Sequence, residues 1–304
     1  MIELFYINRE GTSAALDSAP FTVKGPRVDR AKVCRFSVRE TRVAIDIPLN
    51  KSQYHGSSRS VQEQHVIRLI DDYDNDSALS KPRSAHTDDA PFYRNYWLEQ
   101  EIFTRTYYYL SPWARGRCAK QYLSGILVTK REGIQGSLLN PKNFEGVVAD
   151  FLMDRLGRQV FWQGKRSLSN RPSYYGPYHW RVLADAGVPA VAFDMHRFPD
   201  PSPRAVKMRF ACFAIDTKHL LCLQFDDNVS PYDNKETLRR VIDAVNAYST
   251  QVIDAVRIHL PDDLKSAYKQ ACESGAPISE QLQPFDFEKM LKEDWAYHAK
   301  HQRR

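Results

Sequence analysis

The sequence predicts an α+β fold built from antiparallel sheets, with helices packed on one face of each sheet. Two observations support this class: short runs in which apolar and polar residues alternate, as in half-buried strands, and longer segments in which apolar residues recur at helical spacing. The order strand, strand, helix occurs twice, over residues 97–157 and 188–258. We therefore expect two lobes, an N-terminal one over residues 1–157 and a C-terminal one over residues 158–304, each with its own sheet.

Alternation of apolar and polar residues predicts a strand over residues 2–7 and four further strands in the first lobe. The clearest pattern covers residues 33–49 and is expected to form two strands around a turn near Glu40. Two more strands are expected over residues 97–109 and 121–129, and a helix is expected over residues 60–70.

The strongest helical pattern of the first lobe begins after Asn140. Asn140 is a suitable N-cap, and Pro141 suits the first helical position because it has no amide hydrogen to leave unpaired. The apolar stripe consists of Phe144, Val147, Val148, Phe151, Leu152 and Leu156. Gly157 is expected to end the helix.

The second lobe repeats the same order of elements. Three strands are expected, and the last two form a hairpin with its turn at residues 216–218. A long helix with continuous helical spacing is expected over residues 235–258. The other predicted elements are strands over 188–198, 206–215 and 220–225 and helices over 262–273 and 287–299. Asp262 or Asp263 is expected to cap the first of these two helices.

The composition is that of an ordinary globular protein. Of the 304 residues, 42% are hydrophobic and 26% charged, which supplies a core and argues against extensive disorder. Residues 71–91 are rich in Asp, Ser and Pro, so we expect an exposed loop or linker there. The five cysteines are odd in number and scattered, which is atypical of a disulfide framework or a zinc site. No signal peptide and no apolar run of roughly 20 residues is evident, so we expect a cytoplasmic protein with no membrane partner.

Two segments combine positive charge with aromatic side chains. Residues 105–131 and 155–184 each contain six Lys or Arg residues and no Asp or Glu. Cations bind phosphates, exposed rings stack on bases, and Arg, Tyr and Trp dominate the hot spots of protein interfaces. The segments are therefore candidates for binding a protein or a nucleic acid. If the aromatic residues belong to the core instead, the cations form only a solvated rim.

Turn residues between Ser167 and Pro177 predict a loop that displays several tyrosines. A loop of this kind on a rigid scaffold is a natural binding edge. We expect Arg171, Tyr174 and Tyr175 to be at least partly exposed. The side chains expected to contact a partner are Arg115, Arg117, Arg166, Arg171, Tyr174, Tyr175 and Tyr178.

The sequence contains none of the marked catalytic, metal-binding or nucleotide-binding motifs, so we assign no catalytic residue, metal ligand or cofactor. Asp194 and His196 share one face of an expected strand, with Asp200 nearby, and mark the best place for acid–base chemistry. A His and a carboxylate at this spacing also arise by chance. Cys212 and Cys222 lie in the expected hairpin and are interpreted as thiols packed in the core.

The last half of the chain carries a resemblance to a known class of proteins. Residues 180–183 lead into the apolar run 188–193, which is followed by the hairpin over 207–225 and the long helix. This order resembles the cytoplasmic immunity proteins of secreted bacterial effectors, including those of type VI secretion. The resemblance implies a non-catalytic, toxin–antitoxin type of protein that binds a cognate effector toxin and blocks its active site. A protein that blocks a nuclease usually has an acidic surface, so the net charge of +6 favours an acidic partner or a lipase- or peptidase-type effector.

Two other functions stay open at this point. The first is nucleic-acid binding through the two basic segments, which predicts an affinity that falls steeply as salt rises. The second is an enzyme of a class without a marked motif, which predicts a concave site that gathers polar groups with shifted pKa values.

Overall fold

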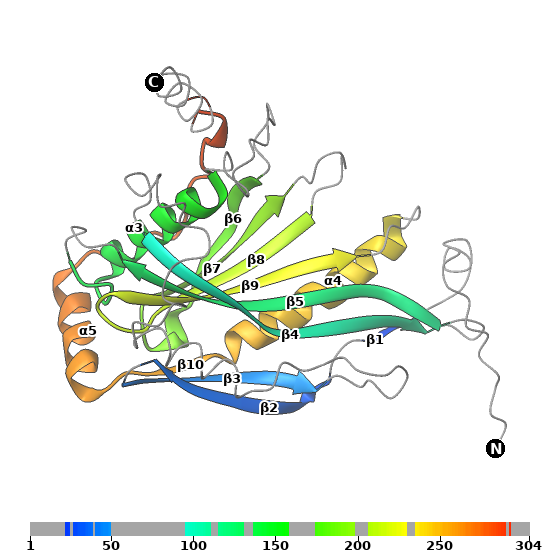
Figure 1. Cartoon of the computed structure of the whole chain (residues 1–304), viewed down its shortest axis with the longest axis horizontal. Helices are drawn as coiled ribbons and strands as arrows, with labels where there is room; N and C mark the ends of the chain where they lie inside the picture. Colours follow the sequence, from blue (N-terminus) through cyan, green and yellow to red (C-terminus); the bar gives the residue numbers. More distant parts are fainter. Residues whose placement is uncertain are drawn as a thin grey trace, which may run out of the picture.

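The computed structural model shows an α+β protein with two antiparallel sheets, as the sequence predicts (Figure 1). It describes residues 22–24, 27–38, 40–49, 95–110, 115–130, 136–157, 174–197, 206–229, 235–289 and 292. The predictions that fall outside these residues are the strand over 2–7, the helix over 60–70, the loop over 71–91, most of the helix over 287–299, and the side chains of Arg115, Arg166, Arg171 and Asp200.

The large sheet has seven strands in the order β1-β4-β5-β9-β8-β7-β6, each antiparallel to its neighbours. The strands are β1 (Thr22–Lys24), β4 (Asn95–Leu110), β5 (Arg115–Lys130), β6 (Tyr174–Val182), β7 (Ala190–Arg197), β8 (Val206–Ala214) and β9 (His219–Val229). The strands predicted within β4, β5, β7, β8 and β9 are confirmed.

The large sheet joins the two halves of the chain. β5 pairs with β9 from Ala119 opposite Val229 to Thr129 opposite His219. Because β5 precedes residue 157 and β9 follows it, strands of both predicted lobes lie in one sheet, which differs from the predicted division into a sheet for each lobe. Alternation identifies a strand and its buried face, but it does not identify the strand that lies beside it.

The small sheet also combines distant parts of the chain. Its order is β10-β3-β2, and its strands are β2 (Arg27–Val38), β3 (Thr41–Leu49) and β10 (Arg257–His259). The strand pair predicted over residues 33–49 is confirmed. The hydroxyl of Thr41 donates a buried hydrogen bond of 2.6 Å to the carbonyl of Ile215, which ties the small sheet to the hairpin turn of the large one.

The long helix is shorter than predicted. Helix α4 covers Lys235–Asp254. After it, buried Val256 and Ile258 alternate with exposed Arg257 and His259, and this period of two produces strand β10. The sequence interpretation extended the helix over these residues because Val256 also fits the helical stripe.

Helix α3 (Pro141–Leu152) begins as predicted. The side chain of Asn140 accepts hydrogen bonds from the backbone amides of Lys142 and Asn143. A short π-helical turn, η2 (Met153–Gly157), continues it to the predicted end.

Helix α5 (Asp262–Ser274) is confirmed, but its predicted cap is wrong. Pro261 occupies the N-cap position, and no side chain caps the helix. Asp262 and Asp263 lie in the first turn, where their charges complement the positive end of the helix dipole.

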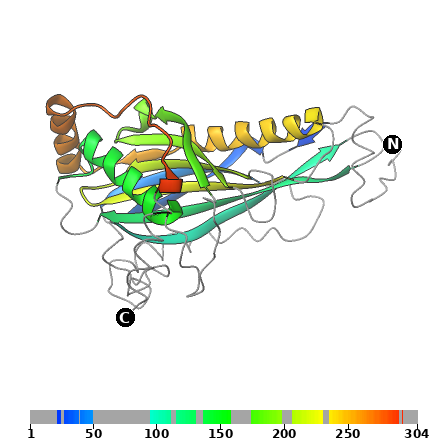
Figure 2. The ribbon, with the colours of Figure 1, turned by 90° about the horizontal axis from the view of Figure 1, so that it is seen from above.

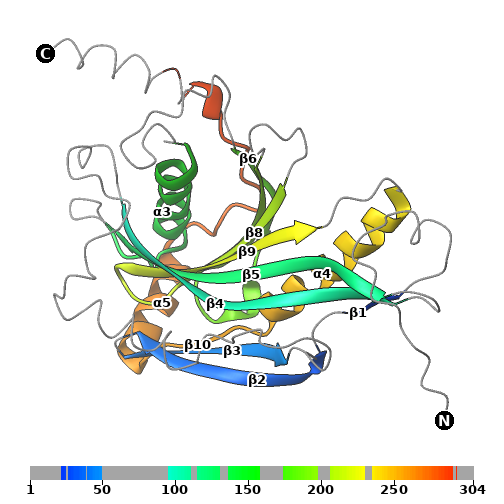
Figure 3. The same ribbon diagram turned by 45° about the vertical axis from the view of Figure 1, so that its right-hand side comes forward.

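The large sheet lies between two layers. Helix α4 runs along one face, and α3 packs on the opposite face (Figures 2 and 3). In β8, Ala211 and Phe213 belong to the core shared with α4 and the small sheet, whereas Phe210 and Cys212 belong to the core shared with α3. Because successive strand residues face opposite sides, each central strand contributes to both cores.

Candidate functional site

Asp194 lies at the centre of a polar cluster on the α4 side of the large sheet. Its neighbours Phe193 and Met195 belong to the core on the α3 side, so alternation along β7 turns Asp194 to the other face. Only 4% of the Asp194 side chain is exposed. A carboxylate buried to this extent requires charged or hydrogen-bonding partners.

Three cationic or titratable side chains surround the Asp194 carboxylate. Lys207 Nζ lies 2.8 Å from Oδ2, His179 Nδ1 lies 2.8 Å from the same oxygen, and Arg209 Nε lies 3.0 Å from Oδ1. Burial alone would raise the pKa of Asp194, but the hydrogen bond from Lys207 and the charges of Arg209 and Lys207 hold that pKa below its usual value. The carboxylate is therefore ionised near neutral pH. We call these four residues the Asp194 cluster.

Arg209 connects the Asp194 cluster to helix α4. Its Nη1 atom donates to the backbone carbonyl of Asn246 and to the hydroxyls of Ser249 and Thr250, at 2.8 to 2.9 Å. Because the guanidinium of Arg209 binds both Asp194 and α4, it fixes the position of the helix relative to strands β7 and β8.

His179 is the exposed member of the Asp194 cluster. Its side chain is 75% exposed, and its backbone has a φ of 53°, a left-handed conformation that residues with a Cβ seldom adopt. It lies in β6 where the pairing with β7 is irregular, with register shifts on both sides of Tyr178. The hydrogen bond between His179 Nδ1 and Asp194 fixes the orientation of the imidazole, although the ring faces solvent.

Tyr178 and His196 extend the cluster toward the edge of the sheet. Their rings lie 4.9 Å apart, and His196 stands opposite Tyr175 in β6 and Lys207 in β8. Burial lowers the pKa of His196 from its usual value, although the charge of Asp194 acts in the opposite direction.

The centre of the large sheet contains a second set of hydrogen-bonded polar side chains. Gln121 Nε2 donates to Asp227 Oδ1 at 2.6 Å, and Gln121 Oε1 accepts from the hydroxyl of Tyr107 at 3.1 Å. Burial raises the pKa of Asp227 to about 7, although Lys207 and Arg209 lie near enough to lower it.

We expect Asp227→Asn to raise the free energy of unfolding at pH 8 by roughly 1–2 kcal/mol. The folded pKa of Asp227, about 7, lies above the unfolded value of 3.8, so stability is lost as pH rises between these values, and the full penalty applies above pH 7. Asparagine keeps the acceptor for Gln121 and removes the charge. Urea unfolding at pH 8, pH 5 and below pH 3.8 tests this: the gain should be smaller at pH 5 than at pH 8 and should disappear below the unfolded pKa of 3.8, and an equal gain at all three values would contradict it.

The predicted binding tyrosines lie on a strand and not on a loop. Tyr174, Tyr175 and Tyr178 are all partly exposed on β6, which confirms the expected exposure of Tyr174 and Tyr175. They divide between the two faces, because Tyr174 packs against the α3-side core while Tyr178 contacts His196. The described part of the predicted loop, residues 174–177, is wrong, because Gly176 and Pro177 here produce an irregular strand. Residues 167–173 of that prediction lie outside the described residues.

The described cations expected to bind a partner from the first basic segment lie far from strand β6 of the second. Arg115 and exposed Arg117 lie on β5, and three strands separate β5 from β6.

The structure confirms that Asp194 and His196, the predicted acid–base pair, share one face of β7. The side chains that contact Asp194, however, come from β6 and β8. The available signal was Lys207 and Arg209, two cations at alternate positions in the otherwise apolar strand β8.

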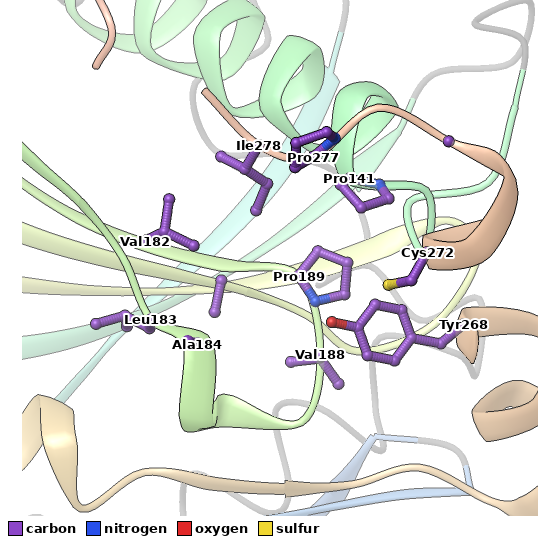
Figure 4. A pocket seen from close by; sticks show the side chains of 12 residues that line it. Pro141, Val182, Leu183, Ala184, Val188, Pro189, Tyr268, Cys272, Pro277 and Ile278 are labelled. Atoms are coloured by element: carbon purple, nitrogen blue, oxygen red, sulfur yellow. The ribbon is translucent and has the colours of Figure 1, made fainter. Parts of the chain in front are cut away.

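The structure also contains a shallow apolar pocket of about 220 Å³ at the other end of β7 (Figure 4). The start of α3, the corner before β7 and helix α5 line it, and none of the Asp194 cluster does. Burial and the neighbouring thiol of Cys272 raise the pKa of Tyr268, one of its lining residues, to about 12.

The two cysteines of the central hairpin fit the sequence interpretation. Cys212 and Cys222 are fully buried opposite each other in β8 and β9, as packed thiols. Within the described ranges, no three His, Cys, Asp or Glu side chains lie close enough to hold a metal ion.

Fold and site together define a class: an α+β protein whose large antiparallel sheet carries a buried ion-pair cluster beneath an irregular, aromatic edge strand. No protein-family model, curated protein or solved structure matches the chain. In the part of the chain that the structure describes, no helix has the length and apolar character required to cross a membrane.

Proposed function

We propose that this chain is a non-catalytic protein-binding protein, and that it acts as an immunity protein that neutralises a cognate bacterial effector toxin. The observation that carries the proposal is the outer strand β6, where Tyr178, His179, Arg181 and Val182 face solvent at least in part. We call these four residues the β6 edge. Tyr and Arg are the residue types that most often dominate binding energy at protein interfaces.

The β6 edge is held in place before any partner binds. His179 is fixed by Asp194, Tyr178 rests on His196, and Arg181 pairs with Asp254 of α4 at 2.9 Å. Side chains that are already ordered lose less conformational entropy on binding, which favours affinity. This rigidity supports a docking role for the strand.

The irregular backbone of β6 favours docking through side chains over addition of a further strand. Gly176 has a φ of 137°, and a Cβ placed there would lie 2.7 Å from the sulfur of Met195. The outward carbonyl of Gly176 already accepts a hydrogen bond from the backbone amide of Phe285 at 2.7 Å. Bulges and covered backbone groups are the devices by which edge strands avoid pairing with other chains.

We expect Tyr178→Ala/His179→Ala to weaken partner binding at least ten-fold, because two ordered contact side chains are lost. The tagged chain would be used to capture proteins from lysate of its native host, with nuclease present. The captured partner would then be purified for affinity measurements and expressed with and without the chain to measure growth.

Lys265→Ala/Lys269→Ala, on the exposed face of α5, is the control. The proposal requires a single stoichiometric partner that is toxic alone, is neutralised by the wild type and the control, and is not neutralised by the β6 variant. Capture of nucleic acid that is released at moderate salt would contradict it and favour the nucleic-acid alternative.

One observation favours an enzyme as a second candidate. A buried carboxylate that holds one nitrogen of an exposed imidazole is the arrangement used by general bases, because it fixes the tautomer and stabilises the protonated ring. The same purified proteins separate the two candidates. If the wild type hydrolyses 4-nitrophenyl acetate well above the rate of free imidazole and His179→Ala does not, the enzyme is favoured; equal rates favour the binding protein.

A further inference from the structure

The outer face of the small sheet gathers positive charge. Val43, Ile45 and Ile258 point inward and belong to the core shared with α4, so the residues between them point outward. Four of the outward side chains are basic and exposed: Arg35 of β2, Arg42 of β3, and Arg257 and His259 of β10. We call these four residues the arginine face.

Strand register places the members of the arginine face close together. Arg35 and Arg257 both stand opposite Ala44, one from each neighbouring strand. In the next row, Ser37 and His259 stand on either side of Arg42. Since neighbouring strands lie about 4.8 Å apart, Arg35 and Arg257 are roughly 10 Å apart, with only a methyl group between them.

Within the described part of the chain, no carboxylate pairs with the basic side chains of this face. Among the described residues, Arg35, Arg42 and His259 form no ion pair, and Arg257 donates to the backbone carbonyls of Asp254 and Val256. Arg181, Arg239 and Arg240, which are exposed elsewhere on the surface, each pair with a carboxylate. The guanidinium groups of Arg35 and Arg42 therefore stay available, unlike those of Arg181, Arg239 and Arg240.

Among the described residues, Asp46 and Glu40 carry acidic side chains on or beside the strands of the arginine face, and the nearby carboxylate of Asp254 pairs with Arg181. Asp46 is partly buried opposite Val33, and Glu40 is exposed beside the turn between β2 and β3. The face keeps a net positive charge when both are counted.

We propose that the arginine face is a docking surface for a short acidic segment of a partner protein. Arginine binds carboxylates through two parallel hydrogen bonds, and the row spacing of about 7 Å along a strand matches alternate side chains of an extended peptide. The inference does not rest on the β6 edge, which lies on the other sheet, and it names an acidic partner on grounds of charge complementarity.

The character of the face favours an acidic peptide over nucleic acid. Its described side chains include no Phe, Tyr or Trp on which bases stack, and single-stranded nucleic acid is held largely by such stacking. Four basic groups also provide few phosphate contacts compared with the six to ten typical of tight duplex binding.

The test uses a fluorescein-labelled octaglutamate peptide and the full-length chain at about 50 mM salt, measured by fluorescence polarisation. The variant is Arg35→Gln/Arg42→Gln, which keeps polar side chains on the strands and leaves the backbone contacts of Arg257 intact. Lys265→Gln/Lys269→Gln is the matched control, because it removes the same charge from exposed positions of α5. Thermal unfolding by circular dichroism confirms that both variants are folded.

We expect the arginine variant to bind the peptide at least ten-fold more weakly than the wild type, and the control to stay within two-fold. Equal losses in both variants would show that binding follows net charge alone and would overturn the inference. Stronger competition by duplex DNA or by phosphatidylserine vesicles than by unlabelled peptide would also overturn it. Neutralisation of a toxin by the wild type tests the proposed function separately, because a chain that fails that assay can still bind the peptide.

Discussion

Replacing Asp194 by asparagine is expected to lower the free energy of unfolding by about 3–5 kcal/mol, the range typical of removing one partner from a buried ion pair. Asparagine has nearly the same shape, so the change isolates the charge. Lys207 and Arg209, which are mostly buried, would keep their positive charges beside a neutral group. The amide nitrogen would also replace one carboxylate oxygen by a donor, so either Arg209 or the pair Lys207 and His179 would lose its acceptor. Chemical unfolding at pH 7, followed by circular dichroism, measures the loss.

The effect of Asp194→Asn should depend on pH in a defined direction. The pKa of Asp194 is lower in the folded than in the unfolded protein, so its stabilising contribution is present above the unfolded value and is lost as pH falls through the folded value. The difference between wild type and variant should therefore shrink below about pH 4.

Asp254→Asn is the matched control for this prediction. Asp254 also pairs with an arginine, but both side chains of the Arg181–Asp254 pair are 48% exposed, and such pairs contribute little to stability. We expect a loss within about 0.5 kcal/mol. A comparable loss in Asp194→Asn and Asp254→Asn would show that burial of the Asp194 cluster does not matter.

The second large effect is expected at Phe193. Its ring lies between Trp180 and Phe210, with centroid distances of 5.3 and 5.4 Å and interplanar angles of 18° and 10°, so one stack crosses strands β6, β7 and β8. The side chain is only 2% exposed. Phe193→Ala would leave a cavity and remove both ring contacts, and we expect it to cost about 3–5 kcal/mol.

Phe193→Leu separates the loss of volume from the loss of the ring contacts. Leucine fills most of the space, so we expect a cost of about 1.5 kcal/mol. Urea unfolding measured by circular dichroism avoids the change in fluorescence that the neighbouring Trp180 would itself cause. If Phe193→Leu were as damaging as Phe193→Ala, the stacking geometry and not the volume would determine stability at this position.

Local patterns predicted most elements but not their partners. The cap at Asn140, the apolar stripe of α3 and the short apolar runs of β8 and β9 are short-range features, and the structure follows them. The pairing of β5 with β9, and of β3 with β10, is decided by which exposed strand edges and apolar faces meet in the folded chain. No pattern within one strand records that choice.

The candidate site was predicted in part for the same reason. Alternation along β7 placed Asp194 and His196 on one face, and the structure agrees. His179 was not identified because its position depends on an irregular strand and a left-handed residue. Lys207 and Arg209 were visible as cations in an apolar strand, but only the register between β7 and β8 shows that both reach Asp194.

The strands of the small sheet come from distant parts of the chain, and this has a consequence for folding during synthesis on the ribosome. Strand β10 follows β3 by roughly 200 residues, so β2 and β3 emerge long before the strand and helix that cover their apolar face. At 5–20 residues per second, the hairpin waits for roughly 10–40 seconds with Val43 and Ile45 uncovered. The nascent chain therefore passes through a stage at which chaperones can bind it and neighbouring chains can aggregate with it.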